Sequence, residues 1–382
     1  MKKIAVIFGT RPDTIKLAPV VERLRMKDDI TVVPIATAQH REMLDDVLSV
    51  FRITPAYDLD VMIQKQSLSD LTQNILVKLD KVLSIEQPDM VVVQGDTATT
   101  FVAALAAFYH KVPVAHVEAG LRTNSKYYPF PEEIYRRLTS HMVDLHFTPT
   151  PAATKNLRKE GIGRASIVCT GNTVIDALKM TVQKHYTFTQ SLLSKLTSTP
   201  AKNIIVTAHR RENIGEPLHH ICTAIGHLAT INSDVNFIFP VHRNPTVREV
   251  VFPLLGNRSN IYLIDPLQYG DFVNLVALSE FIITDSGGLQ EEGPALGKPV
   301  LVLRDVTERP EALKFGTVKL VGTDVKTILK TAQKLIDDKK FYRSMARVVN
   351  PYGDGKASDR IVATLQSYFG IKSKKIAEFT PR

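Results

Sequence analysis

Short runs of apolar, often β-branched residues alternate with stretches of helical hydrophobic spacing along the first half of the chain. Residues 3–8 (KIAVIF) have the pattern of a buried strand, and the spacing after them predicts a helix over 13–26. Further strands are predicted at 30–37, 90–93 and 112–116, with a small-residue helix at 98–109. This alternation is typical of a parallel sheet that is covered by helices on both faces.

The same alternation starts again after residue 200. Strands are predicted at 203–207, 236–240, 261–264, 281–284 and 300–303, and helices at 217–231 and 272–277. Two doubly wound units in succession indicate an α/β protein with two Rossmann-like, parallel-sheet domains. We expect one domain at 1–172 and a second at 173–358, with a hinge within 170–182. A C-terminal helix at about 359–382, amphipathic over 359–369, is expected to complete the first domain.

Composition restricts the class of protein. The longest apolar stretches, such as 101–109, are far shorter than the ~18 residues that a membrane span requires. The start Met1-Lys2-Lys3 resembles a signal peptide, but the apolar run after it ends at Gly9 without a small-residue cleavage site. Cys169 and Cys222 are the only cysteines and lack metal-ligand spacing, which favours a cytoplasmic protein without a structural metal.

The charge balance suggests an acidic partner. The chain has 48 lysines and arginines against 39 acidic residues, a formal net charge of +9. No basic run or recognition-helix pattern indicates nucleic acid. A phosphorylated small molecule could use the same charge through a few cations in one site, although a diffusely basic surface is equally compatible with it. Neither GxGxxG nor GxxxxGK[ST] is present, so a dinucleotide cofactor is not expected.

Acidic residues follow the strands of the first predicted sheet, at the edge where parallel sheets bind ligands. Asp96 comes just after the strand at 90–93, and Glu118 after the next strand. The segment PFPEE then introduces Glu132 and Glu133 into a helix. A single such carboxylate is most simply a helix cap. Three at successive positions are what proton transfer at carbon would need.

Cations and small residues follow other strands. Arg11 and Lys16 lie near a predicted helix start after the first strand, where an anion is favoured, although an ordinary turn with a solvated arginine fits equally. In the second half, a phosphate site is predicted at strand ends that carry His209 and Arg210, and Ser286, Gly287 and Gly288. Arg309 and Glu311 follow another strand, where an acidic residue commonly holds ribose hydroxyls. Together these residues describe a nucleotide-diphosphate site in the second domain.

Motifs along nearly the whole chain resemble the non-hydrolysing UDP-N-acetylglucosamine 2-epimerases. They are FGTRPDTIKLAP, TAQHREML, QGDTATTF, HVEAGLRT, PFPEE, DLHFTPT, TGNTVIDAL, TAHRREN, DPLQYGDF, TDSGGLQEE, LGKPVLVLRD, TERPE and NPYGDGKAS. The resemblance implies a GT-B fold, with the two domains facing each other across a cleft, in a homodimer that needs neither a metal nor a nicotinamide cofactor. It also implies abstraction of the C2 proton with loss of UDP to give 2-acetamidoglucal, followed by reprotonation and return of UDP.

The resemblance assigns roles to residues of this sequence. Asp96, Glu118 and Glu132 match the catalytic carboxylates, and His209 matches a residue of the catalytic and diphosphate site. Diphosphate contacts are implied for Arg11, Lys16, Ser286 and Gly287, ribose contacts for Glu292 and Glu311, and a uracil contact for Phe272. Substrate binding is also expected of Arg210, Gly288 and Arg309. An activator site, which would bind a second substrate molecule, is implied near Gln39, Glu42 and Lys65.

The sequence departs from the family at a few of these positions. Asp13 stands where the family has glutamate, Tyr135 where it has asparagine, and Gly293 where it has alanine. Glu42 and Lys65 replace an expected glutamine and arginine. Four alternatives therefore remain: the same chemistry on a modified UDP-N-acetylhexosamine, a GT-B glycosyltransferase that uses a UDP-sugar donor, a hydrolysing relative and a non-catalytic sugar-nucleotide sensor.

Overall fold

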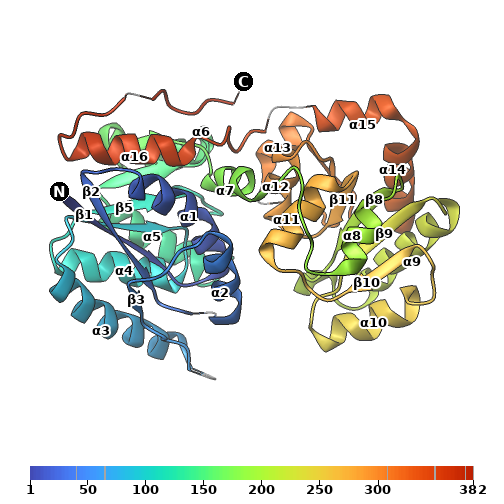
Figure 1. Ribbon diagram of the computed structural model, residues 1–382, viewed down its shortest axis with the longest axis horizontal. Coiled ribbons are helices and arrows are strands. Elements are labelled where there is room, and N and C mark those ends of the chain that lie inside the picture. Colours follow the sequence, from blue (N-terminus) through green and yellow to red (C-terminus); the bar gives the residue numbers. More distant parts are fainter. Residues whose placement is uncertain (40, 64–65, 308, 348–349, 375, 382) are drawn as a thin grey trace. The chain divides into compact units, whose positions relative to one another are not determined.

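The computed structural model describes residues 1–39, 41–63, 66–307, 309–347, 350–374 and 376–381, with only the backbone for 41–43. The chain divides into two compact units. Unit 1 comprises Met1–Met180 and Tyr352–Pro381, and unit 2 comprises Thr181–Pro351. Each contains one parallel sheet with its own helices (Figure 1).

Unit 1 is built on a seven-stranded sheet of order β3-β2-β1-β4-β5-β6-β7 in which all neighbouring strands are parallel. Its strands are β1 Lys2–Phe8, β2 Ile30–Ala36, β3 Tyr57–Asp58, β4 Met90–Gln94, β5 Val114–Val117, β6 Leu145–Thr148 and β7 Ile167–Cys169. Its helices are α1 Arg11–Arg25, α2 Arg41–Val50, α3 Leu68–Glu86, α4 Ala98–Tyr109, α5 Glu132–Met142, α6 Pro151–Lys159, α7 Thr173–Thr181 and α16 Ala357–Tyr368, with a 3₁₀ turn at Arg164–Ser166.

Unit 2 repeats the design on a six-stranded parallel sheet of order β10-β9-β8-β11-β12-β13. Its strands are β8 Lys202–Thr207, β9 Val235–Pro240, β10 Ile261–Ile264, β11 Phe281–Thr284, β12 Val300–Val302 and β13 Val318–Leu320. Its helices are α8 Ser191–Thr197, α9 Glu216–Ile231, α10 Pro245–Leu255, α11 Tyr269–Leu278, α12 Leu289–Ala295, α13 Pro310–Phe315, α14 Val325–Asp337 and α15 Lys339–Ala346, with a 3₁₀ turn at Arg211–Asn213.

Apolar side chains on both faces of each sheet explain the strand patterns read from the sequence. On one face of the unit 1 sheet, Ile4 and Val6 pack with Leu17 of α1, and on the other Ala5 and Ile7 join a separate cluster. A strand buried on both faces reads as a continuous apolar run, as 3–8 does. The two-domain, parallel-sheet α/β architecture predicted from the sequence is therefore confirmed.

The divisions between the units differ from the predicted ones. Residues 173–180 and 352–358, expected in the second domain, belong to unit 1. Asp176 of α7 explains this placement, since it accepts hydrogen bonds from the backbone N–H of Ala357 at 3.2 Å and of Ser358 at 2.8 Å. The two segments thus hold each other on unit 1.

The C-terminal helix is shorter than the predicted 359–382. Helix α16 ends at Tyr368, and Gly370 follows with a φ of +70°, a conformation that terminates helices. Val362 and Leu365 of α16 join the core cluster that includes Leu17 of α1, and Figure 1 shows α16 (red) lying on unit 1. The chain after it runs beside β7, where the Phe379 N–H donates to Cys169 O at 2.8 Å.

Candidate functional site

Glu118 follows β5 and is the most fully hydrogen-bonded of the predicted catalytic carboxylates. Lys16 Nζ lies 2.6 Å and 2.7 Å from its two carboxylate oxygens, Asn172 Nδ2 donates to Oε1 at 3.0 Å, and Gln94 Nε2 donates to Oε2. Its φ is +63°, a backbone conformation that costs free energy for a residue other than glycine. Contacts from three separate parts of the chain therefore hold the side chain of Glu118.

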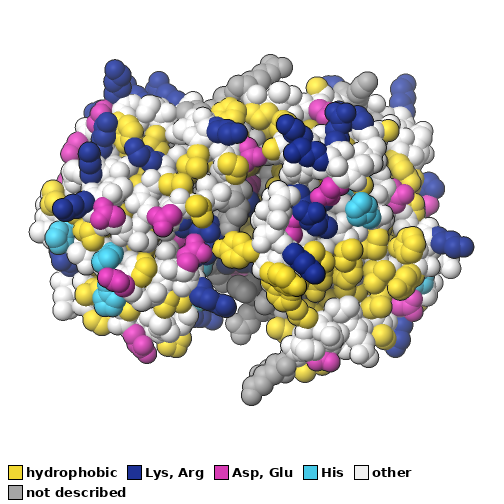
Figure 2. Space-filling model, turned by 180° about the vertical axis from the view of Figure 1, so that it is seen from behind, with side chains coloured by type: hydrophobic (Ala, Val, Ile, Leu, Met, Phe, Trp, Pro, Cys, Tyr) yellow, Lys and Arg dark blue, Asp and Glu magenta, His cyan; other side chains and the backbone are white. Residues whose placement is uncertain are grey.

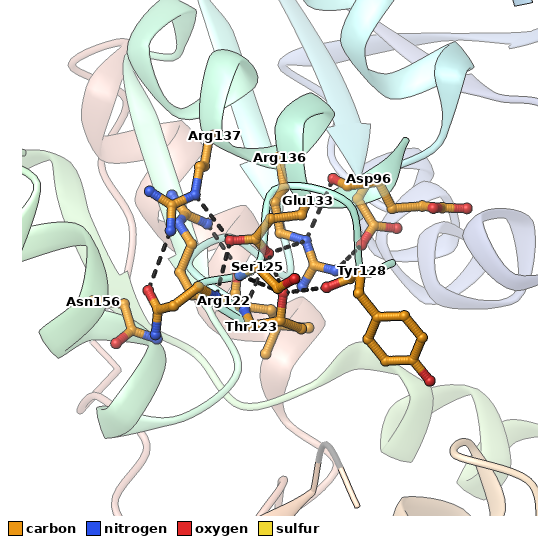
Figure 3. Close-up of polar contacts among 12 residues, drawn as sticks. Asp96, Arg122, Thr123, Ser125, Tyr128, Glu133, Arg136, Arg137 and Asn156 are labelled. Carbon is orange, nitrogen blue, oxygen red and sulfur yellow. Dashed lines mark hydrogen bonds and ion pairs between the residues drawn. The ribbon is translucent and has the colours of Figure 1, made fainter. Parts of the chain in front are cut away.

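Asp96 follows β4, the strand next to β5, and forms an ion pair with Arg136 of α5. Its Oδ2 lies 3.1 Å from Arg136 Nη2 (Figure 3). Burial raises the pKa of Asp96; Arg136 opposes that increase, and the nearby charges of Glu118 and Glu132 add to it. These electrostatic interactions place Asp96 near the other two predicted catalytic carboxylates.

Glu132 and Glu133, adjacent in sequence, have different surroundings at the start of α5. Glu133 is fully buried and accepts hydrogen bonds from Thr123 N at 3.0 Å and Arg137 Nε at 2.9 Å, and Figure 3 shows it among these donors. Glu132 Oε2 is buried without a hydrogen-bond partner among the described residues. The structure thus uses Glu133 to hold the loop before α5, whereas an oxygen of Glu132 is buried without such a donor.

The polar residues at the start of α1 have different partners. Arg11 is half-buried at the helix start, and Lys16 contacts Glu118. Asp13 points back to the loop, where it accepts from Gly9 N at 3.1 Å and Thr10 N at 2.8 Å, and burial raises its pKa to about 6. Asp13 therefore shapes the turn after β1. Tyr135, the other departure, stacks on Phe101 with ring centroids 5.1 Å apart.

His116 supports the Asp96 loop from within the sheet, because its Nε2 lies 2.7 Å from Gly95 O. Burial lowers the pKa of His116 from 6.5 to about 3, so the folded protein binds no proton there at pH 5, whereas the unfolded chain does. Stability is therefore lost as the pH falls below 6.5, and this residue contributes a loss of about 2 kcal/mol at pH 5.

We expect His116→Gln to remove that pH dependence, because the glutamine amide can still donate to Gly95 O but does not titrate. Urea unfolding at pH 7 and pH 5 should show a difference smaller by about 2 kcal/mol than in the wild type. The exposed His219→Gln is the matched control and should behave as wild type. An H116Q variant that keeps the full wild-type difference would contradict this assignment.

In unit 2, Asp285 organises the loop that follows β8. Asp285 is fully buried at the end of β11, and its Oδ2 accepts from His209 N at 2.8 Å, Arg210 N at 2.8 Å and Asn213 Nδ2 at 3.0 Å. The ends of β8 and β11 are adjacent, since Thr207 Oγ1 and Thr284 Oγ1 lie 2.5 Å apart. One carboxylate thus gives the 208–213 loop its shape.

Several predicted diphosphate residues come together at this edge of the unit 2 sheet. The His209 ring stacks on His242, with centroids 5.7 Å apart, and desolvation lowers the His209 pKa while Asp285 opposes the shift. A Cβ on Gly287 would lie 3.3 Å from Arg210 Nη2, so the guanidinium lies against the 285–288 loop. Ser286 is half-buried on that loop, and Gly288 is exposed.

The remaining predicted contacts lie on neighbouring elements of unit 2. Glu292 Oε1 would lie 3.5 Å from a Cβ on Gly288, so its side chain borders the same loop. Arg309 precedes α13 and forms an ion pair with the buried Glu291. Glu311 is half-buried in the first turn of α13, and Phe272 is half-buried on α11.

The predicted activator residues can be placed only in part. Gln39 is half-buried, and its Oε1 accepts from Thr99 Oγ1 of α4 at 3.3 Å. The side chain of Glu42 and the whole of Lys65 lie outside the described residues. The activator site stays a prediction.

Four residues that were not predicted from the sequence contact the predicted site residues. Gln94 and Asn172 bind Glu118, Arg136 binds Asp96, and Asp285 binds the His209 backbone. Gln94 and Asp285 stand at strand ends, a signal that could have found them. No local pattern indicated the partners of Arg136 and Asn172, because both contacts depend on the direction of a side chain.

The described residues contain no group of three or more histidine, cysteine or acidic residues placed to hold a metal ion. Nor do they include a helix that is long and apolar enough to cross a membrane.

Comparisons with known proteins give one consistent result. The family model for UDP-N-acetylglucosamine 2-epimerase matches residues 22–366. The UDP-N-acetylglucosamine 2-epimerase of Bacillus subtilis is 49% identical over 382 residues, covering 100% of both chains. The structure of S. aureus MnaA with UDP is similar at 49% identity and a TM-score of 0.89, covering 100% of both chains. That of the Neisseria meningitidis UDP-GlcNAc 2-epimerase bound to UDP-GlcNAc has 48% identity and a TM-score of 0.86, covering 96% of this chain and 100% of the other.

Proposed function

The chain belongs to the UDP-N-acetylglucosamine 2-epimerase family, and we propose that it reversibly inverts C2 of UDP-N-acetylglucosamine to give UDP-N-acetylmannosamine. The observation that carries this proposal is the group of three carboxylates in unit 1, Asp96, Glu118 and Glu132. Their surroundings differ: Arg136 pairs with Asp96, three side-chain donors hold Glu118, and Glu132 has a buried oxygen without a partner among the described residues. Groups in such different environments can hold and release protons at different stages of one reaction.

The chemical steps that we propose balance as an elimination and its reverse. A carboxylate takes the C2 proton, the electron pair forms the C1–C2 double bond, and the bond from C1 to the diphosphate oxygen breaks to release UDP. A proton then returns to C2 on the opposite face, and the UDP oxygen forms the bond to C1 again. Attack on both faces requires two proton carriers, drawn in this proposal from Asp96, Glu118 and Glu132.

The leaving UDP needs cations and N–H donors. We assign this role in unit 2 to His209, Arg210, Ser286 and the 287–288 backbone, held in shape by Asp285. Arg11, Lys16 and Arg309 complete the proposed diphosphate contacts, with Glu292 and Glu311 for ribose and Phe272 for uracil. Relatives that carry UDP or UDP-GlcNAc support the assignment. Donors preorganised for the charge that develops on the leaving group are each worth roughly 3 kcal/mol.

The departures at positions 13 and 135 do not favour a modified sugar. Asp13 is occupied by the Gly9 and Thr10 amides, and Tyr135 packs on Phe101. Both residues thus have structural roles that account for them. A glycosyltransferase would need an acceptor and a single base, so the set of three carboxylates favours the epimerase.

The proposal is tested by incubating the protein with UDP-N-acetylglucosamine alone and separating the products by anion exchange. We expect UDP-N-acetylmannosamine, and the same equilibrium mixture when the reaction starts from that product. Free N-acetylmannosamine accumulating with UDP would indicate the hydrolysing reaction instead. An unchanged substrate that turns over only when an acceptor is added would indicate a transferase.

Assembly and location are further parts of the proposal. Exposed apolar side chains gather on α3 and α5 of unit 1, including Leu68, Val77 and Leu138, and Figure 2 shows hydrophobic side chains (yellow) on this unit. With the family resemblance, this surface supports a homodimer, which light scattering would detect. The buried, free Cys169 and Cys222 fit a reducing cytoplasm, where the product would supply surface polysaccharide synthesis.

A further inference from the structure

Two sequence motifs that the proposed function leaves unused meet in unit 1. They are TGN at 170–172 and YGDG at 352–355, near the points where the chain leaves and re-enters this unit. The Asn172 N–H donates to Tyr352 O at 2.7 Å. A Cβ on Gly353 would lie only 3.0 Å from Ile175 Cγ1 and 3.3 Å from Asn172 O. The absence of a side chain at Gly353 thus allows the two segments to pack closely.

The side chain of Asn172 extends from this junction to Glu118. Asn172 is 3% exposed, and its Nδ2 donates to Glu118 Oε1 at 3.0 Å. Its Oδ1 accepts from Val174 N at 3.1 Å. Because a backbone N–H needs an acceptor, the amide oxygen must face Val174 and the NH₂ group must face Glu118. The orientation of the donor is therefore fixed by the junction.

The other donors to Glu118 come from different places. Lys16 lies on α1 and Gln94 ends β4, so Asn172 is the member of this donor set that belongs to the junction. A carboxylate that accepts hydrogen bonds in its ionised form binds a proton less readily. A donor at 3.0 Å thus influences both where Glu118 points and how readily it accepts a proton.

We propose that Asn172 is a positioning residue for Glu118, which links the carboxylate to the junction of the 170–172 and 352–355 segments. The effect of this positioning on catalysis rests on the proposed function, in which Glu118 is a proton carrier. The hydrogen-bond linkage itself does not depend on that function. A change in the path of the junction would move the Asn172 donor and alter the proton affinity of Glu118.

The first test compares the pH dependence of kcat/KM in the wild type with Asn172→Asp and Asn172→Ser. N172D keeps an oxygen for Val174 N–H but replaces the donor to Glu118 with a second carboxylate, so we expect the acid limb to move up by about one pH unit. N172S loses the donor without adding charge, and kcat/KM should fall roughly 10- to 100-fold with a smaller shift in the same direction.

Asp176→Asn is the matched control. It weakens the neighbouring contact to Ala357 and Ser358 and leaves the three donors to Glu118 unchanged. We expect a lower melting temperature with the wild-type pH profile, because D176N leaves in place the hydrogen bond from the Asn172 N–H to Tyr352 O that sets the path of the junction. If N172S and D176N give the same profile, the effect of Asn172 is structural and the inference is overturned.

A second measurement tests the link between Asn172 and Glu118 without an enzyme assay, by following the titration of the Glu118 carboxyl group. In protein labelled with ¹³C at the glutamate carboxyl carbons, the Glu118 signal is the one that Glu118→Gln removes. Its titration midpoint should be higher in N172D and N172S than in the wild type, by about one pH unit in N172D. Unchanged midpoints in these variants would overturn the linkage. A wild type that shows no epimerisation would overturn the proposed function while leaving this titration valid as a test.

Discussion

Asp96→Asn is expected to lower kcat for C2 epimerisation by about 100- to 10,000-fold, with little change in the affinity for UDP. Asparagine keeps the size of the side chain and an oxygen for Arg136, but it cannot accept a proton from carbon or return one. Burial raises the pKa of the wild-type Asp96 carboxyl, although the positive charge of Arg136 lowers it. A raised pKa fits a group that must bind a proton during turnover. Steady-state kinetics and UDP titration calorimetry would measure the two parameters.

Asp89→Asn provides the matched control for this variant. Asp89 precedes β4 and Asp96 follows it, so the two residues lie at opposite ends of one strand. Each is also paired with a cation, since Lys2 Nζ lies 2.7 Å from Asp89 Oδ1. We expect D89N to retain wild-type kcat. If D96N retained kcat as well, Asp96 would not be a proton carrier, and the proposed division of roles among the three carboxylates would be wrong.

Asp285→Ala is expected to weaken UDP binding at least 100-fold and to lower the free energy of unfolding of unit 2 by about 3 kcal/mol. The substitution removes the acceptor of three donors, among them the backbone N–H groups of His209 and Arg210. Each buried donor left unsatisfied costs about 1–3 kcal/mol. The 208–213 loop would then lose the shape that presents His209 and Arg210 to the diphosphate.

Two further variants show whether the loss of UDP binding comes from this loop. Asp285→Asn keeps an acceptor oxygen, so its UDP affinity should fall less, by roughly 10-fold. Asp324→Ala removes an N-cap acceptor at α14, where Asp324 Oδ2 accepts from Thr327 N, and should leave UDP affinity unchanged. Titration calorimetry with UDP measures the affinity of all three variants. Equal losses in D285A and D324A would show that destabilisation of unit 2, and not the loop, controls binding.

The general position of the candidate site followed from the sequence because parallel sheets collect their ligands at one edge. Asp96 and Glu118 could be assigned to adjacent strand ends from the apolar runs that precede them. The strands β3, β6, β7 and β13 were not found, because each has at most four residues and none contains an apolar run as long as 300–303, which revealed the short β12. The end of α16 was also missed, although the amphipathic spacing stops at 369 and Gly370 follows it as a stop signal.

Roles that depend on side-chain direction were beyond the sequence. Glu132 and Glu133 are adjacent carboxylates, and Arg136 and Arg137 are adjacent cations, so composition cannot distinguish the members of either pair. The phase of α5 does so, because it brings Arg136 to Asp96 as well as to Glu133, whereas Arg137 donates to Glu133 (Figure 3). Likewise, Asn172 contacts Glu118 across 54 positions of sequence, and no local pattern reports such a contact.

The most direct test of the account is to follow C2 of UDP-N-acetylglucosamine by proton NMR while the protein turns it over in D₂O, with EDTA present and no nicotinamide added. Abstraction of the C2 proton by a carboxylate predicts that UDP-N-acetylmannosamine appears with deuterium at C2. The C2 proton signal of the remaining substrate should also decline as the reaction reverses. Formation of UDP-N-acetylmannosamine that still carries the original proton, or no change at C2 under any condition, would contradict the proposed elimination and return of UDP.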